Sequence, residues 1–181
     1  IVIPQGVTEI GPCCFSSSGF NGTLTLHDGI GIIGSEAFSH TPLKGELHLP
    51  KNLEVVSDEA FNGCDFSGAL LLPKSVKQIG ARAFAYNWRL MGTLDIPEGE
   101  LSIGAGAFAH CRSLDGVIFP ESLESIKYEP SWSEDGGAFQ NCYGIGRIVC
   151  KGTIPAYVQD GSFNGVPKDN FTLEVPEGHE A

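Results

Sequence analysis

The stretch Ile79-Gly80-Ala81-Arg82-Ala83-Phe84 recurs along the chain and indicates how the chain folds. Close copies occupy residues 33–38 and 103–108, and weaker copies occupy residues 10–15, 56–61 and, with an insertion, 126–139. The phenylalanines that close these copies, and one more beyond them, follow one another at intervals of 23, 23, 23, 24, 31 and 24 residues: Phe15, Phe38, Phe61, Phe84, Phe108, Phe139 and Phe163. A regular period in the twenties is typical of a solenoid, in which each repeat forms one coil.

A second pattern, apolar-x-apolar followed by proline, keeps the same spacing as the phenylalanines. It occupies residues 1–3, 24–26, 47–49, 70–72, 94–96, 117–119, 148–150 and 173–175, with other residues in place of proline in two copies. Alternation within such a short strand turns the first and third side chains to one face, and these are almost all apolar, so we expect that face to be buried. The two patterns predict a single solenoid domain over residues 1–181, with about seven coils and a parallel sheet.

The rest of each repeat predicts a corner, a buried ring and a short helical turn. The glycine after Ile79 either takes a positive φ or allows a tight corner. The Ala-Phe pair and about three following residues are expected to form a 3₁₀ or helical turn. Coils stacked about 4.7–5 Å apart place each phenylalanine over the one before it, so stability depends on contacts between coils.

Composition and charge exclude some classes of partner. Hydrophobic residues make up 41% of the 181 residues and charged residues 18%, so we expect the chain to fold. A net charge of −11 disfavours nucleic acids and anionic membranes, which attract clusters of Lys and Arg. No run of about 18 apolar residues occurs, so no membrane span is predicted. The chain opens within the strand pattern, at Ile1-Val2-Ile3-Pro4, and we expect its natural N-terminus to have been trimmed.

Six cysteines raise the question of disulfide bonds. Cys64, Cys111 and Cys142 each stand three residues after a phenylalanine, while Cys14 and Cys150 replace residues at positions expected to be buried. These positions predict buried free thiols, because free Cys packs as a small hydrophobic residue. A disulfide between Cys111 and Cys142, in adjacent coils, is the alternative. No Cys-x-x-Cys motif, histidine cluster or catalytic arrangement stands out, so we expect no metal, no cofactor and no enzymatic activity.

The repeats resemble the BspA-like leucine-rich repeats of bacterial and protist surface proteins. The resemblance rests on residues 70–73, on Ile79-Gly80 with Ala83-Phe84, and on the variant Ala107-Phe108-Ala109-His110-Cys111-Arg112-Ser113-Leu114. It implies an α/β leucine-rich-repeat solenoid that is β-rich, right-handed and curved, with the parallel sheet on the concave side and the short helical turns on the convex side. It also implies a secreted or surface-anchored protein that binds other proteins, often as an adhesin. His27 and Lys151 depart from the pattern where it has proline.

The candidate binding residues lie where the repeat turns outward or is interrupted. The middle positions of the strands supply an outward column that includes His48, Leu71, Asp95, Ile118 and Val149. An exposed apolar patch there would mark a binding site, although strands also favour such residues without any binding role.

The insertion within residues 127–137 adds a second candidate. It carries Tyr128 and Trp132, which either form a hot spot for a partner or fold back over the phenylalanine rings. We therefore expect a cell-surface or secreted module that recognises a host extracellular or matrix protein, with a glycan as the other ligand class. The alternative function is a structural spacer within a longer repeat protein.

Overall fold

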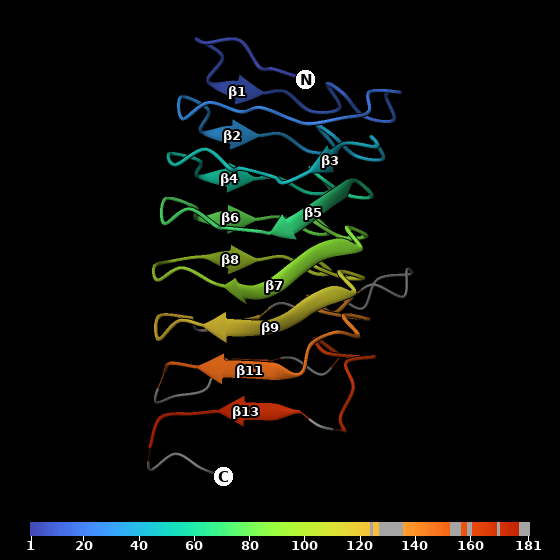
Figure 1. Cartoon of the computed structure of the whole chain (residues 1–181). Helices are drawn as coiled ribbons and strands as arrows, with labels where there is room; N and C mark the ends of the chain where they lie inside the picture. The colour runs from blue at the N-terminus through green and yellow to red at the C-terminus, as the bar shows by residue number, and fades with distance from the viewer. Residues whose placement is uncertain (124, 127–135, 153–156, 159–160, 170, 178–181) are drawn as a thin grey trace.

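The computed structural model describes residues 1–123, 125–126, 136–152, 157–158, 161–169 and 171–177. In Figure 1 the chain descends from the N-terminus at the top to the C-terminus at the bottom in stacked coils. The long strands in front run to the left and the short strands behind run to the right, so the coils wind in a right-handed sense. The predicted β-rich solenoid is confirmed, and no helix occurs in the described residues.

The longer strands form one parallel sheet in the order β13-β11-β9-β7-β5-β3. Its members are β3 (Lys44–Gly45), β5 (Asp65–Ala69), β7 (Arg89–Asp95), β9 (Ser113–Phe119), β11 (Arg147–Cys150) and β13 (Thr172–Glu174). The first residues of most predicted strands, such as Leu94 and Val117, are buried as expected, but Leu173 is 58% exposed. Residues 47–49 and 70–72 lie outside the assigned strands, because pairing in those coils occurs earlier, in β3 and β5.

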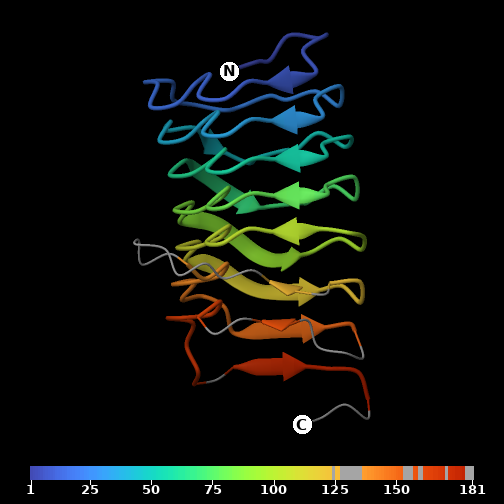
Figure 2. The ribbon, with the colours of Figure 1, turned by 180° about the vertical axis from the view of Figure 1, so that it is seen from behind.

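A second parallel sheet lies on the opposite side of the coils, at the repeated Ile-Gly corner (Figure 2). It comprises β1 (Glu9–Ile10), β2 (Ile32–Ile33), β4 (Val55–Val56), β6 (Gln78–Ile79) and β8 (Ser102–Ile103), and a separate pair joins β10 (Ser125–Ile126) to β12 (Tyr157–Val158). Glycine is needed at this corner for space. A Cβ on Gly104 would lie 2.5 Å from the backbone nitrogen of Ala81 in the preceding coil. The positive φ is not found at Gly34, Gly80 or Gly104, and the close approach of the preceding coil is what requires glycine there.

The segment around each phenylalanine is a hydrogen-bonded turn, so the predicted 3₁₀ or helical turn is wrong. Arg82 and Tyr86, two residues before and after Phe84, have φ values of 51° and 61°. The Phe84 N–H donates to the Ala107 carbonyl of the next coil at 2.8 Å. The adjacent Ala83 N–H donates within its own coil. The N–H groups of Arg82, Phe84 and Tyr86 all donate to the next coil, so every second N–H points along the stack, whereas a 3₁₀ helix would keep these bonds within one coil.

The phenylalanines form a continuous stack through the interior. Successive rings from Phe15 to Phe163 lie 5.1–5.5 Å apart between centroids, with interplanar angles of 2–14°. The rings from Phe38 to Phe139 are fully buried. Each aromatic pair adds about 0.5–1.5 kcal/mol beyond the burial of its area, so the stack ties every coil to the next.

A row of donor side chains lines this phenylalanine stack, three residues after each ring. In five coils the side chain donates a hydrogen bond to the phenylalanine carbonyl of the preceding coil: Thr41 to Phe15, Cys64 to Phe38, Asn87 to Phe61, Cys111 to Phe84 and Cys142 to Phe108. We call these five side chains the donor column. Thr, Cys and Asn can each occupy this position because each is small and has a hydrogen to donate.

The cysteines are free thiols, as predicted, but they do not share one environment. Cys64, Cys111 and Cys142 are buried, and burial raises the pKa of the Cys64 and Cys142 thiols to about 12. Cys150 is half-buried. The expectation that Cys14 is buried is wrong, because its side chain is exposed.

Candidate partner-binding surface

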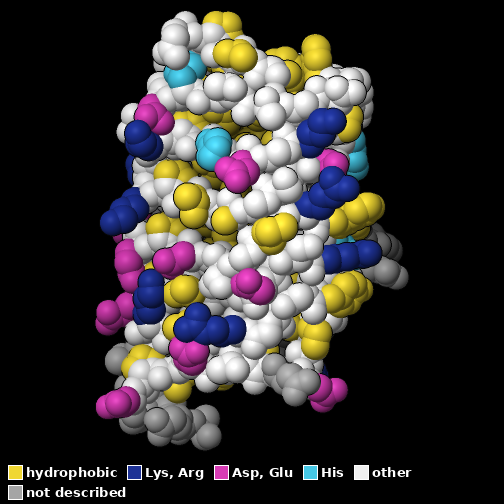
Figure 3. Space-filling view, viewed as in Figure 1, with side chains coloured by type: hydrophobic (Ala, Val, Ile, Leu, Met, Phe, Trp, Pro, Cys, Tyr) yellow, Lys and Arg dark blue, Asp and Glu magenta, His cyan; other side chains and the backbone are white. Residues whose placement is uncertain are grey.

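The outward column predicted from the strands does face solvent. Leu71 is 75% exposed, and His48 and Asp95 are exposed as well. Ile118 and Val149 are half-buried. The exposed apolar residues in the middle of this face are Leu71, the adjacent Ala69 and its register partner Met91, which we call the sheet patch. Figure 3 shows hydrophobic atoms in the middle of this face, with charged side chains above and below them.

Charged pairs separate the sheet patch from the other predicted apolar residues. Lys151 Nζ lies 3.3 Å from Asp95 Oδ1, and this pair crosses the end of β9 beside Ile118. Arg147, in the same strand β11 as Val149, donates to both carboxylate oxygens of Glu174, the register partner of Val149 in β13, at 2.7 and 2.9 Å. The Arg147 hydrogen bonds hold the pKa of Glu174 below its usual value. Leu71, Ile118 and Val149 are therefore brought onto one face without forming a continuous apolar surface. Tyr128 and Trp132 lie outside the described residues.

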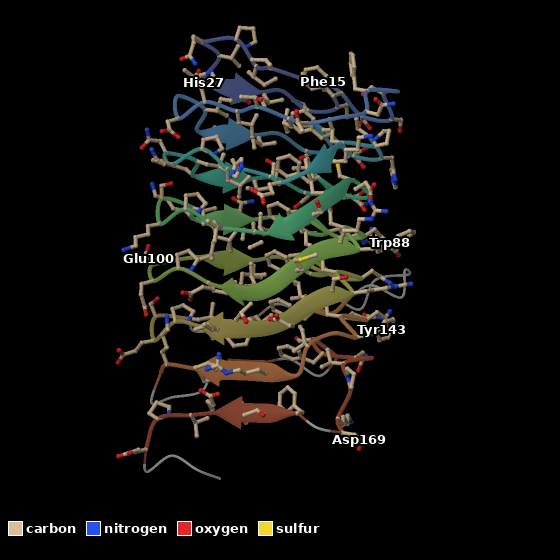
Figure 4. All side chains as sticks on the ribbon, viewed as in Figure 1. Phe15, His27, Trp88, Glu100, Tyr143 and Asp169 are labelled. Carbon is tan, nitrogen blue, oxygen red and sulfur yellow. The ribbon has the colours of Figure 1, made fainter. Side chains whose placement is uncertain are left out.

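A second surface, which sequence analysis missed, runs along the edge where each phenylalanine turn leads into its strand. Its residues stand four positions after the phenylalanines: Pro42, Asp65, Trp88, Arg112, Tyr143 and Pro167. We call this row the edge ladder. Trp88 is 55% exposed and Tyr143 is 48% exposed. Figure 4 shows Trp88 and Tyr143 projecting from the same edge of the stack, away from the sheet.

Arg112 fills the coil between the two exposed rings of the edge ladder. Its guanidinium carbon lies 5.5 Å from the centroid of Trp88 and 5.6 Å from the centroid of Tyr143. Both distances suit cation–π attraction, which extends to about 6 Å. The rings and the guanidinium hold one another in place while remaining exposed, so the surface is ordered before any partner binds. The signal that could have found it is the period itself, read four residues beyond each phenylalanine.

A parallel row lies two residues closer to the phenylalanine stack. Tyr86 and His110 stack with centroids 4.4 Å apart and an interplanar angle of 10°. Asn141 Nδ2 lies 3.3 Å from His110 Nε2, which extends the row into the next coil. In the coil before Tyr86 the same position is Gly63, so the row has no side chain there. A Cβ on Gly63 would lie 2.7 Å from His40 Nδ1.

The glycine at this position leaves an open pocket of about 510 Å³ at the edge. It is lined by His40, Pro42, Gly63, Cys64, Asp65, Tyr86 and Trp88, and we call it the edge pocket. Two aromatic rings therefore face one carboxylate and one imidazole. Pockets with apolar walls and a few polar groups are typical of sites that recognise one chemical group.

The described residues place limits on other chemistry. No three His, Cys, Asp or Glu side chains come close enough together there to hold a metal ion. A membrane-spanning helix is likewise not found in the part of the chain that the structure describes.

Comparison with known proteins identifies the repeats. The family model of the BspA type leucine rich repeat region matches residues 1–91 and 86–165, in six copies. The chain belongs to this family. The six copies follow the stacked coils described above, and the resemblance predicted from the sequence is confirmed. No curated protein matches the chain.

Two solved structures of leucine-rich repeat proteins are similar to this chain. A leucine-rich repeat protein from Bacteroides ovatus ATCC 8483 is 18% identical with a TM-score of 0.40, over 98% of this chain and 57% of that one. A leucine rich cell surface protein from Faecalibacterium prausnitzii A2-165 is 17% identical with a TM-score of 0.42, over 93% of this chain and 63% of that one. The BspA-type chain thus spans less than two thirds of either protein.

Proposed function

We propose that this chain is a protein-binding module of a cell-surface or secreted repeat protein. Its contact surface is centred on the edge ladder and reaches the sheet patch. The observation that carries the proposal is the exposed sandwich of Trp88, Arg112 and Tyr143. Trp, Tyr and Arg are the residue types most enriched at the energetic centres of protein interfaces. Membership of the BspA-type family supports an interaction module, and its surface-protein members support the proposed location.

The geometry favours the edge ladder over the sheet face as the centre of the interface. Aromatic rings held by Arg112 lose little rotamer freedom on binding, so less of the binding energy is spent on ordering them. On the sheet face, Leu71 and Met91 add apolar area next to Arg89, which links the two regions in β7. His48, Asp95, Ile118 and Val149 would then contact the margin of a partner. We propose a host extracellular or matrix protein as the partner class, and no catalytic step.

A spacer role is the second candidate, and one observation favours it. The apolar residues of the outward column are divided by the Asp95–Lys151 pair, so the sheet face has no continuous groove of its own. A spacer, however, gives no reason for three coils to align two exposed rings around an arginine.

A peptide-display selection separates these two functions. The immobilised chain is screened against a random peptide library, alongside a matched variant carrying Trp88→Ala, Arg112→Ala and Tyr143→Ala. A binding module enriches peptides that lose at least about tenfold in affinity on the triple variant, which is about 1.4 kcal/mol. Folding of both proteins is checked by circular dichroism. A selection that enriches nothing, or peptides that bind the triple variant equally well, would contradict the proposed function.

A further inference from the structure

Two neighbouring parts of the edge ladder differ in what lies beside the exposed ring of Trp88. In one, Arg112 lies between Trp88 in the preceding coil and Tyr143 in the following coil. In the other, the coil of Asp65 lies between those of Pro42 and Trp88, and its residue in the edge ladder is the short aspartate in place of an arginine. The edge pocket is the space that remains there. The guanidinium of Arg112, in the coil after Trp88, therefore shows which kind of group packs against the Trp88 ring.

The two aromatic rings of the pocket are already covered on the side that faces the C-terminal coils. Arg112 lies over Trp88, and His110 stacks on Tyr86. The pocket lies on the other side of both rings, toward His40 and Pro42. A flat group that enters it can therefore stack against the parts of the Tyr86 and Trp88 rings that line the pocket.

The acidic group of the pocket is a carboxylate, beside the imidazole of His40. Asp65 lies in the pocket wall, and its side chain is 46% exposed. Its partner Arg89 lies 3.3 Å away and is 66% exposed. Exposed ion pairs of this kind contribute little and exchange readily. A net charge of −11 adds a general attraction for cations, which increases the rate at which a basic ligand reaches the surface.

We propose that the edge pocket binds an arginine side chain of the protein partner. This inference rests on the proposed function and names the chemistry that the site selects. A guanidinium is flat, stacks on aromatic faces and pairs with a carboxylate through two parallel N–H groups. It would take the position beside Trp88 and Tyr86 that Arg112 takes between Trp88 and Tyr143, with Asp65 supplying the charge. A lysine ammonium is compact and strongly hydrated, so it fits this flat site less well.

The first test uses small probes and the intact chain. N-acetyl-arginine methylamide is titrated into ¹⁵N-labelled protein, and the indole N–H signal of Trp88, assigned with Trp88→Phe, is followed by NMR. We expect saturable shifts with a dissociation constant in the millimolar range, about −4 kcal/mol. The neutral isostere N-acetyl-citrulline methylamide should bind at least about tenfold more weakly. Equal binding of the citrulline or lysine derivative would overturn the assignment to arginine.

Variants of Asp65 and a matched control test the site itself. Asp65→Asn should weaken the arginine derivative about three- to tenfold, and Asp65→Arg should abolish its binding by placing a guanidinium in the pocket. Asp115→Asn, which changes an exposed carboxylate bonded to Thr93 outside the pocket, should leave binding unchanged. The ¹⁵N spectrum of each variant verifies its fold. Equal loss in Asp65→Asn and Asp115→Asn would show a general charge effect and overturn the proposal.

The remaining outcomes separate this inference from the proposed function. Saturable shifts of Trp88 by N-acetylglucosamine or galactose, with competition against arginine, would identify a sugar site and overturn the proposal. Peptides from the display selection should contain arginine and lose affinity on Asp65→Asn. Selected peptides that need Trp88 but contain no arginine would overturn the inference while the binding function stands. Arginine binding in the absence of any selected peptide would support the pocket and contradict the module.

Discussion

Two rows of stacked side chains run through the same turns, four residues apart, and they have opposite properties. The phenylalanine stack repeats one residue type, and its central rings are fully buried. The edge ladder changes residue from coil to coil, and Trp88 and Tyr143 remain about half exposed. Buried rows hold the coils together, whether they repeat one residue, as the phenylalanine stack does, or vary, as the donor column does. Exposed positions that vary are free to select a partner, so the function of a repeat protein is best sought in an exposed row that keeps the period but not the residue.

Truncating one ring in each row tests most strongly whether the buried row stabilises the fold and the exposed row does not. Phe84→Ala removes a fully buried ring that touches both neighbouring rings, so it should lower the free energy of unfolding by about 3–5 kcal/mol. Trp88→Ala, the matched exposed ring, should cost under about 1 kcal/mol. Urea denaturation measures both. Similar losses in the two variants would show that the edge ladder is also part of the core.

The cysteines offer the same contrast with one residue type. Burial raises the pKa of the Cys64 and Cys142 thiols from the 9.0 of an ordinary thiol to about 12. Their thiolates at pH 8 should therefore be about a thousandfold rarer than those of an ordinary thiol. We expect a disulfide reagent to modify the exposed Cys13 and Cys14 quickly and the three buried thiols only on unfolding. Rapid modification of all six would contradict the buried column.

The same pKa shift predicts how stability depends on pH. Between pH 9 and 12 the unfolded chain releases the thiol protons that the folded chain keeps, so the unfolded state binds fewer protons. The free energy of unfolding should therefore fall as the pH rises above 9, by about 1.4 kcal/mol per pH unit for each buried thiol. Cys64→Thr, which uses another residue of the donor column, should reduce this slope. An unchanged slope in that variant would contradict the assignment to Cys64.

A smaller effect tests the donor column. Asn87 Nδ2 donates to the Phe61 carbonyl at 2.8 Å and to the Phe84 carbonyl at 3.0 Å. Asn87→Ala leaves these carbonyls without that donor and should cost about 1–3 kcal/mol. Asn87→Cys restores the donor found in three other coils and should recover part of the loss. Thermal unfolding measures the stability of both variants. An equal loss of stability in Asn87→Ala and Asn87→Cys would show that the hydrogen bond from this position does not stabilise the fold.

The smallest expected effect concerns the edge itself. Arg112→Met keeps an unbranched side chain between Trp88 and Tyr143 but removes the charge, so it should cost under about 1 kcal/mol in chemical denaturation. Arg112→Lys, the control, should have a free energy of unfolding between those of the wild-type chain and Arg112→Met. A loss above about 2 kcal/mol would show that Arg112 stabilises the fold rather than preorganising a binding surface.

The sequence predicted the fold because the fold depends on what repeats. The phenylalanine period and the apolar-x-apolar pattern predicted the stacked coils, the buried rings and the burial of Cys64, Cys111 and Cys142. The turn was mispredicted because left-handed residues such as Arg82 and Tyr86 leave no residue-type signal, unlike glycine. The edge ladder was missed for the opposite reason. Trp88, Arg112 and Tyr143 differ in type, so they form a row only when the coils are placed in register.

The most direct test of the account compares two single variants on one selected peptide. Isothermal titration of the tightest arginine-containing peptide should show at least about a tenfold loss of affinity for Trp88→Ala. Leu71→Glu, at the edge of the sheet patch, should lose less than about threefold, because margins of interfaces contribute little. Circular dichroism should show both variants folded at the temperature of the measurement. A larger loss for Leu71→Glu than for Trp88→Ala, or no loss for either, would contradict the claim that the edge ladder is the centre of binding.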